Sequence, residues 1–194
     1  MTIVGKRIGL FFGSFNPVHT GHMIIANYMV TKAGLDEVWM IVSPHNPLKD
    51  KKSLANDHDR LHLVNLAIGD NLKIKASNIE FQLPKPSYTI DTLVYLEEKY
   101  PQHQFILLMG GDNLLTLDKW KSHEKIVEHP IYVYKRPGNT GGLYENHPNV
   151  HYMDAPMLDI SATYIRECLQ QGHSIEYLVP DRVYDYLLNN KIYR

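Results

Sequence analysis

Two histidines three positions apart, His19 and His22, carry the clearest chemistry in the sequence. They follow a short apolar run that ends at Gly13, and Thr20 and Gly21 separate them. Helical side chains at positions i and i+3 lie on the same face, so both imidazoles can meet one phosphate group. Thr20 is a candidate N-cap, which would leave N–H groups of the first helical turn facing an anion. Because a phosphoryl group in transfer needs positioned donors more than a nucleophile, the pattern indicates phosphate chemistry.

Other interpretations of these histidines remain open. A histidine pair is more often a pair of surface or packing residues than a functional site. A zinc site would need a third ligand, and no nearby cysteine or tight carboxylate cluster supplies one. A second pair, His58 and His62, is flanked by Asp57 and Asp59 and fits a solvated helical face better than a surface metal site. No protein-held metal is therefore predicted.

A second group of phosphate-binding side chains lies near the end of the chain. Ser161 and Thr163 place hydroxyls at the start of an expected helix, where unpaired N–H groups favour anions. Arg166, one turn later, can fork onto phosphate oxygens. Capping alone would also explain Ser161 and Thr163. Cys168 falls on the inward face of the same helix, so no chemical role is predicted for it.

Apolar runs alternate with helical patterns along the whole chain, which predicts an α/β fold. Buried strands of this kind form a doubly wound, Rossmann-like, mostly parallel sheet with helices on both faces. The predicted strands are 7–13, 38–42, 105–109, 131–134 and 149–153, with short extended pieces around Ile74 and at 79–81. The predicted helices are 20–33, one opening at Asp57, 89–98, 161–171 and a last one through Tyr186.

Ligands of such sheets bind beyond the carboxyl ends of the strands, where the strand order switches. Four segments are then candidates for one shared site: 13–22, 43–49, 110–120 and 159–166. The polar, lysine-rich loop at 43–56 could act as a lid over that site. Arg60, in the following helix, is either structural or part of a basic wall.

Composition excludes several classes of protein. The 194 residues are 44% hydrophobic and 21% charged, which predicts a single folded domain over 1–194. Lysine and arginine number 20 against 21 acidic residues, so a net charge of -1 argues against a nucleic-acid partner. The single cysteine excludes an internal disulfide and fits a reducing, cytoplasmic setting. No run is long enough to span a bilayer and residues 1–7 do not form a secretory signal, so no membrane partner is expected.

Four segments carry a resemblance to a known family. The His-Thr-Gly-His stretch and the ISATYIR stretch at 160–166 resemble the two signatures of the nucleotidyltransferase superfamily. The PSYTIDT stretch at 86–92 and the segment 110–120 are similar to bacterial nicotinate-nucleotide adenylyltransferases. The Tyr177–Pro180 stretch and the terminal Tyr193 also resemble that family, so the likeness covers nearly the whole chain.

The resemblance implies a reaction. ATP and nicotinate mononucleotide would give nicotinic acid adenine dinucleotide and pyrophosphate, with Mg²⁺ accompanying ATP, by a direct in-line displacement without a covalent enzyme intermediate. Three alternatives stay open: an adenylyltransferase that prefers nicotinamide mononucleotide, one that acts on phosphopantetheine, and a nucleotide-binding sensor without turnover. A homo-oligomer is also left open.

The same resemblance assigns residues to catalysis and to ATP. The implied catalytic residues are His19, His22, Lys49 and Arg166. The implied ATP-binding residues are Gly13, Ser14, Phe15, His19, His22, Gly110, Asp112, Ile160, Ser161, Thr163 and Arg166. Gly13 is expected to let the backbone approach the ligand closely. Asp112 would accept ribose hydroxyls or help to hold magnesium, although it could equally cap a turn.

Nicotinate mononucleotide would contact a separate set of side chains. The implied residues are Asn16, Lys49, Ser87, Tyr88, Thr89 and Trp120. Trp120 offers a plane for stacking on the pyridine ring, and Thr89 could place helix N–H groups against the carboxylate. Packing explains Trp120, capping explains Thr89 and solvation explains Lys49 about as well. The family usually has an aspartate where Asn16 stands, which weakens any metal role at that position.

Overall fold

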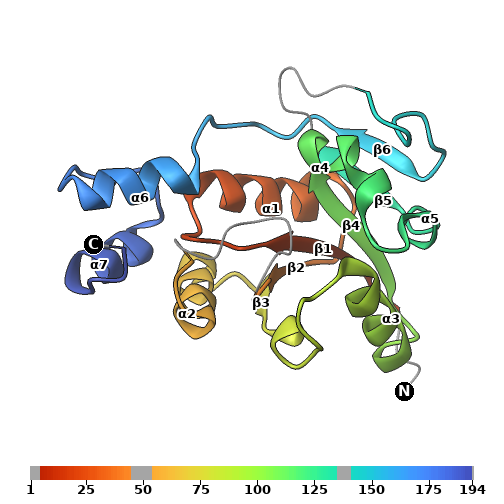
Figure 1. Cartoon of the computed structure of the whole chain (residues 1–194), viewed down its shortest axis with the longest axis horizontal. Helices are drawn as coiled ribbons and strands as arrows, with labels where there is room; N and C mark the ends of the chain where they lie inside the picture. Colours follow the sequence, from red (N-terminus) through yellow and green to blue (C-terminus); the bar gives the residue numbers. More distant parts are fainter. Residues whose placement is uncertain (1–4, 45–53, 135–140, 194) are drawn as a thin grey trace.

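The computed structural model describes residues 5–44, 54–134 and 141–193, and its centre is one sheet of six parallel strands (Figure 1). The strands are β1 (Arg7–Gly13), β2 (Glu37–Val42), β3 (Ile74–Ser77), β4 (Gln104–Gly110), β5 (Ile131–Tyr134) and β6 (Val150–Met153). The α-helices are α1 (Thr20–Lys32), α2 (Asp57–Ile68), α3 (Thr89–Lys99), α4 (Gly111–Leu115), α5 (His123–Ile126), α6 (Ala162–Gln170) and α7 (Asp181–Asn189). Two short 3₁₀ helices are η1 (Ile79–Phe81) and η2 (Leu117–Lys119).

The strand order is β3-β2-β1-β4-β5-β6, which confirms the predicted doubly wound fold. The chain first builds outward from β1 to β3 and then returns to build from β4 to β6 on the other side of β1. The order therefore reverses between β1 and β4, which pair in parallel. In folds of this kind the crevice beyond that reversal is where ligands bind.

Two apolar cores, one on each face of the sheet, hold the helices in place. Side chains alternate along β1, so Ile8 and Leu10 enter the core under α3, while Phe11 enters the core under α1, α2, α6 and α7. In Figure 1 α6 and α7 lie at the left end of the molecule, and α3 and α5 lie at the right end. Of the helices among the described residues, none combines the length and the apolar composition needed to cross a bilayer.

The segment 79–81 differs from its prediction. It was expected to be extended, but it forms η1, in which the N–H groups of Phe81 and Gln82 donate to the carbonyls of Asn78 and Ile79. Ser77 ends the edge strand β3, and its hydroxyl accepts a bond from the Ile79 N–H at 3.4 Å. A serine that bonds to the backbone two residues on favours a turn over continued extension.

At the opposite end of the strands from the site, Glu37 is buried in an ion-pair cluster. Its carboxylate contacts Lys6 Nζ at 2.5 Å, Lys75 Nζ at 2.8 Å and Trp39 Nε1 at 2.8 Å. Burial alone would raise the pKa of this carboxyl, but the hydrogen bonds from Lys6, Lys75 and Trp39 together lower the pKa to about 2.

The stabilisation from Glu37 should disappear in acid. A carboxyl whose folded pKa lies below its unfolded value of about 4.3 stabilises the fold above that pH, and the effect is lost as the pH falls toward about 2. We therefore expect Glu37→Gln to unfold at lower urea than the wild type at pH 6, with the difference shrinking by pH 3. A difference that stays constant from pH 6 to pH 3 would show that the Glu37 charge is not the cause.

Candidate active site

The two histidines lie at the start of α1, beyond the end of β1. His19 is the N-cap residue, with φ −141° and ψ 170°, and Thr20 is the first helical residue. The prediction of Thr20 as the N-cap is therefore wrong by one position. The reason lies near the end of the chain, because the Thr20 N–H donates to the Leu178 carbonyl at 3.0 Å and its hydroxyl donates to the Tyr177 carbonyl at 3.3 Å.

The imidazoles of His19 and His22 stack on each other, with ring centroids 3.6 Å apart and planes inclined by 27°. The His19 N–H donates to His22 Nδ1 at 3.2 Å. Since Nδ1 accepts this bond, the neutral ring carries its proton on Nε2, which makes Nε2 a hydrogen-bond donor. A Cβ atom at Gly21 would lie 3.1 Å from the His19 ring, so the glycine between the histidines leaves room for the stack.

The end of β1 is shaped by an aromatic side chain. A Cβ atom at Gly13 would lie 2.8 Å from the Phe15 ring, so this glycine makes room for Phe15, and Gly13 also lines the cavity beside this strand end. Phe15 itself has φ 45° and is only 2% exposed. Its ring packs 5.1 Å from the His22 ring, so only its backbone can reach a bound nucleotide.

Arg60 fastens two strand ends together from beneath the site. Its guanidinium is fully buried and donates to the carbonyls of Ser14 at 2.5 Å, Ser43 at 2.8 Å and Ala55 at 3.0 Å. It also pairs with Asp57 at 2.7 Å. These contacts support the structural interpretation of Arg60 and not the basic wall.

Arg166 joins α6 to the segment that follows β1. Its Nη1 donates to the Asn16 carbonyl at 2.8 Å across 150 residues of sequence, and its Nη2 donates to Thr163 Oγ1 at 3.2 Å. Asn16 is buried, and its side-chain oxygen accepts a bond from the Ala55 N–H at 3.0 Å. The segments that carry the histidines and the late hydroxyl cluster therefore come together, as one nucleotide site requires.

Ser161 is the N-cap of α6, and its hydroxyl accepts a bond from the Tyr164 N–H at 3.1 Å. The capping interpretation thus describes the Ser161 side chain, although both Ser161 and Thr163 remain exposed. Ile160 packs partly buried against the core that α6 covers. The start of α6 is therefore fixed in position while the side chains of Ser161 and Thr163 stay accessible.

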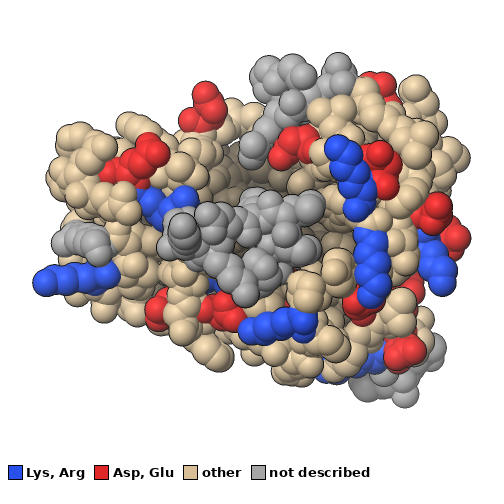
Figure 2. Space-filling view, in the orientation of Figure 1, with Lys and Arg blue, Asp and Glu red and all other residues tan. Residues whose placement is uncertain are grey.

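A cavity of about 350 Å³ opens beside this edge of the sheet, between the ends of β1 and β4 and the start of α3. Figure 2 shows this face hollowed, with lysine and arginine side chains to the right of the hollow. Its polar and aromatic lining includes Gly13, Ser14, Ser43, Glu80, Ser87, Tyr88, Thr89, Asn113, Lys119, Trp120 and Lys121. Four of the six residues predicted to contact the mononucleotide, namely Ser87, Tyr88, Thr89 and Trp120, therefore share one cavity.

The start of α3 faces this cavity. Tyr88 is its N-cap, because the N–H groups of Asp91 and Thr92 both donate to the Tyr88 carbonyl, so the prediction of Thr89 as the cap is wrong. Thr89 is instead the first helical residue, and N–H groups of a first turn have no acceptor within their own helix. This arrangement still offers backbone donors to an anion in the cavity.

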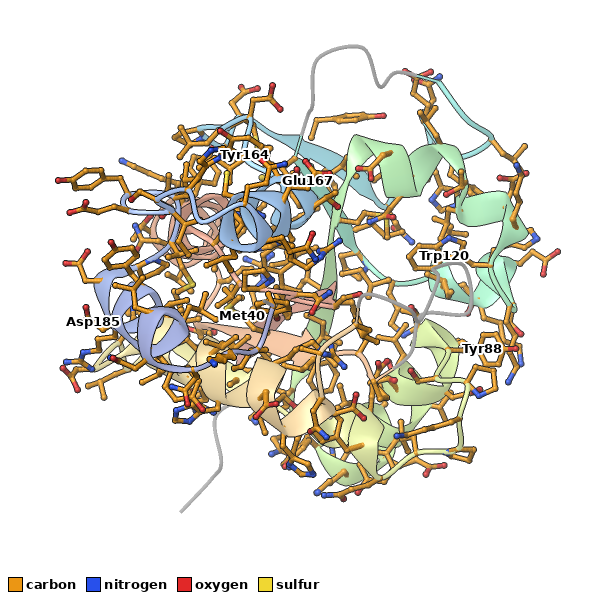
Figure 3. The ribbon with its side chains drawn as sticks, turned by 60° about the vertical axis from the view of Figure 1, so that its left-hand side comes forward. Met40, Tyr88, Trp120, Tyr164, Glu167 and Asp185 are labelled. Atoms are coloured by element: carbon orange, nitrogen blue, oxygen red, sulfur yellow. The ribbon has the colours of Figure 1, made fainter. Side chains whose placement is uncertain are left out.

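Trp120 lines the same cavity from the other side. Its Nε1 is buried and has no hydrogen-bond partner among the described residues. The neighbouring Lys121 pairs with both carboxylate oxygens of Asp91 at 2.9 Å, and its Nζ lies 4.8 Å from the centre of the Tyr88 ring. Figure 3 shows Trp120 and Tyr88 at one end of the molecule and Tyr164, on α6, toward the other.

The comparisons with known proteins agree with this geometry. The family model for cytidylyltransferase-like proteins matches residues 10–168. A probable nicotinate-nucleotide adenylyltransferase of Cytophaga hutchinsonii is 52% identical over 96% of this chain and 98% of its own length. Another from Flavobacterium johnsoniae is 51% identical over 97% of this chain and 99% of its own length.

The chain belongs to the nicotinate-nucleotide adenylyltransferase family.

A solved structure supports the family fold as well. The nicotinic acid mononucleotide adenylyltransferase of Plasmodium falciparum, complexed with NaAD, superposes with a TM-score of 0.81 over 97% of both chains at 20% identity. At that identity the likeness shows the fold. The resemblance to nicotinate-nucleotide adenylyltransferases that the sequence motifs carried is thereby confirmed.

Gly110 and Asp112 do not line the cavity, and neither do the two histidines or the predicted residues of the 160–166 segment. Gly110 ends β4, and a Cβ atom there would lie 2.4 Å from Asp112 Oδ1, so this glycine admits the Asp112 carboxylate. Asp112 itself is exposed in the first turn of α4. Lys49 and most of the lid predicted at 43–56 lie outside the described residues.

Sequence reasoning missed several residues of this adenylyltransferase cavity. Glu80, 2% exposed, accepts bonds from Ser87 Oγ at 3.0 Å and from Thr92 Oγ1 at 2.9 Å. Lys119 and Lys121 are exposed at the cavity rim. The sequence held one signal of the buried Glu80, namely that it lies between the apolar Ile79 and Phe81. Because that segment was expected to be extended, Glu80 was not considered as a site residue.

Proposed function

We propose that this chain transfers the adenylyl group of ATP to nicotinate mononucleotide, releasing pyrophosphate. The observation that carries the proposal is that two groups of residues, one suited to phosphates and one suited to a flat ring, lie next to each other. Arg166 of α6 donates to the Asn16 carbonyl, in the segment that carries the paired histidines, and the cavity bounded by Trp120 and the start of α3 opens beside the end of β1. The first group suits a triphosphate, and the second suits a flat ring that bears a carboxylate.

The chemistry needs no covalent enzyme intermediate. An oxygen of the mononucleotide 5′-phosphate attacks the α-phosphorus of ATP, the bond from that phosphorus to the β-phosphate oxygen breaks, and pyrophosphate leaves with the electron pair. The Nε2–H of His22 would donate to a phosphate oxygen as negative charge develops there. The remaining acceleration comes from holding the two nucleotides in line.

Phosphate binding falls to the two ends of the chain. Arg166 is already oriented by Asn16 and Thr163, so its guanidinium is pre-organised to meet the β- and γ-phosphates beside Ser161. Lys49 would add a cation from the 43–49 segment. Asp112, an exposed carboxylate, provides the oxygen ligand that Mg²⁺ prefers. Magnesium bound with ATP would neutralise phosphate charge.

We also propose a single nucleotidyltransferase domain over 1–194 that works in the cytoplasm. One sheet carries both apolar cores, and the matched relatives are covered over almost their whole length. The only cysteine of the sequence, Cys168, is buried, and a chain with one cysteine needs no oxidising compartment to form a disulfide.

Replacing Trp120 should affect the mononucleotide more than ATP. Stacking of a ring on an aromatic side chain contributes about 1–3 kcal/mol, so Trp120→Leu should raise the KM for nicotinate mononucleotide by roughly 5- to 100-fold. Trp120→Phe keeps an aromatic plane and should lose less. Steady-state kinetics with each substrate varied in turn will decide, and an equal rise in both KM values would point to packing instead.

The activity itself is tested by pyrophosphate release. The chain is supplied with ATP, Mg²⁺ and one acceptor at a time: nicotinate mononucleotide, nicotinamide mononucleotide or phosphopantetheine. We expect the fastest release with the nicotinate form. Faster release with either other acceptor would favour that substrate, and tight ATP binding without release for any acceptor would favour the sensor alternative.

A further inference from the structure

A buried carboxyl group, Glu80, stands at the wall of the mononucleotide cavity. It comes from η1, directly after the edge strand β3, and it is 2% exposed. Three hydroxyl groups donate to it: Ser87 at 3.0 Å, Thr92 at 2.9 Å and Ser43. These hydroxyls belong to three separate segments, namely the end of β2, the loop before α3 and the first turns of α3.

Burying this carboxyl is costly, and its hydroxyl partners offset only part of the cost. Burial raises the pKa of Glu80, while the bonds from Ser43, Thr92 and Ser87 act in the opposite direction. An apolar side chain would fill the same space at lower cost, and a buried polar group of this kind can serve to specify one conformation.

The bonds from Ser87 and Thr92 fix the corner that leads into α3. Ser87 lies one residue before the N-cap Tyr88, and Thr92 lies four residues after Tyr88. With both fastened to one carboxyl, the chain between them has little freedom to turn. That stretch contains Thr89, which lines the cavity, and Ile90; as residues of the first helical turn, both have N–H groups without an acceptor in their own helix.

We propose that Glu80 is a positioning residue for the mononucleotide: it holds the start of α3 so that its N–H groups meet the carboxylate of the pyridine ring. This inference rests on the proposed function. Glu80 would thereby favour the acid mononucleotide over the amide, because only the acid gains a charge-assisted bond from those donors.

The proposed positioning role has a rival that predicts the opposite sign. If the negative charge of Glu80 acted directly on the substrate, it would repel a carboxylate in the cavity. Removing the charge would then lower the KM for nicotinate mononucleotide. If Glu80 acts by positioning, the same change should raise that KM.

A variant at Thr92 distinguishes best between positioning and direct contact with the substrate. It is fully buried and does not belong to the cavity lining, so it cannot touch the substrate. Thr92→Val keeps the shape of the side chain and removes the hydroxyl that donates to Glu80. An effect of this change on the mononucleotide KM would have to act through the Glu80 contact.

The experiment measures kcat and both KM values for the wild type, Glu80→Gln, Thr92→Val and the double variant, with the acid and the amide mononucleotide. Glu37→Gln is the matched control, since Glu37 is also a buried carboxyl but lies at the other end of the strands. We expect Glu80→Gln to raise the KM for nicotinate mononucleotide by roughly ten- to hundredfold. The KM for ATP should change by less than about threefold, and acid-over-amide preference should fall.

Thr92→Val should move the same parameters in the same direction by a smaller factor, and the double variant should show less than the product of the two effects. Glu37→Gln should lower stability and leave both KM values unchanged. A lowered KM in Glu80→Gln, equal changes for both substrates, or no change would each overturn the inference. An inactive wild type would instead overturn the proposed function, and the inference with it.

Discussion

Replacing His22 with alanine should lower kcat by roughly 10²- to 10³-fold while the KM for each substrate changes far less. The reason is the tautomer of the ring. The His19 N–H donates to His22 Nδ1, so the neutral ring carries its only N–H at Nε2, the donor that the proposed mechanism directs to the transferring phosphate. A donor that strengthens its bond only as charge develops acts on kcat more than on binding.

Controls separate this effect from loss of the fold. His22→Gln keeps an N–H donor at the end of the side chain and should retain more activity than the alanine variant. His62→Ala removes a histidine that packs on the Tyr186 ring, away from the site, and should leave kcat unchanged. If His22→Ala keeps the wild-type kcat with pyrophosphate release as the measurement, His22 has no part in the chemistry.

The sheet could be predicted from sequence because its signal is local. Apolar runs such as 105–109 and 131–134, alternating with helices, are typical of a parallel sheet covered on both faces, and the strands lie within one or two residues of the prediction. The site edge followed from the same logic, since the carboxyl ends of parallel strands share one edge. The topology of the sheet brings Arg166 to the carbonyl of Asn16. The resemblance to the family motifs predicted this proximity, whereas the spacing of the residues alone did not.

The errors come from specific contacts that residue preferences do not reveal, one of them made over a long distance in sequence. Both helix starts were misplaced by one residue, because the Thr20 N–H is used by Leu178 and because the Tyr88 carbonyl accepts the first bonds of α3. The sequence did not show that the ring of Phe15 packs against Gly13 at the end of the same strand. A propensity cannot reveal a partner 158 residues away or a ring that folds back on its own strand.

The burial of Glu80 and Arg60 escaped prediction for a related reason. A charged residue is exposed by default, and only a dense set of partners reverses that expectation. Apart from the Asp57 carboxylate, the partners of Arg60 are backbone carbonyls, which every residue carries, so no side-chain pattern reveals them. Backbone carbonyls thus anchor the residue that supports this site, and they leave no signal in the sequence, whereas the chemistry of the site depends on side chains that the sequence shows.

Replacing Arg60 with methionine should lower the free energy of unfolding by about 3–5 kcal/mol. Methionine fills a similar volume, but it donates no hydrogen bond, so the carbonyls of Ser14, Ser43 and Ala55 lose a buried donor and Asp57 loses its buried partner. Such a loss is a large share of the 5–15 kcal/mol typical of a folded domain. Urea unfolding at neutral pH measures it directly.

Two further variants test whether the stability depends on the branched guanidinium of Arg60 and on its burial. Arg60→Lys keeps the charge, but a single ammonium cannot match a planar fork that reaches carbonyls of three segments, so it should recover only part of the stability. Arg182→Met removes an arginine whose pair with Asp70 is exposed, and it should change stability little. Because Arg60 holds the ends of β1 and β2, its loss should also raise the KM for ATP under conditions where the variant remains folded. Wild-type stability in Arg60→Met would mean that the strand ends are held by the sheet alone, and that the site needs no support from α2.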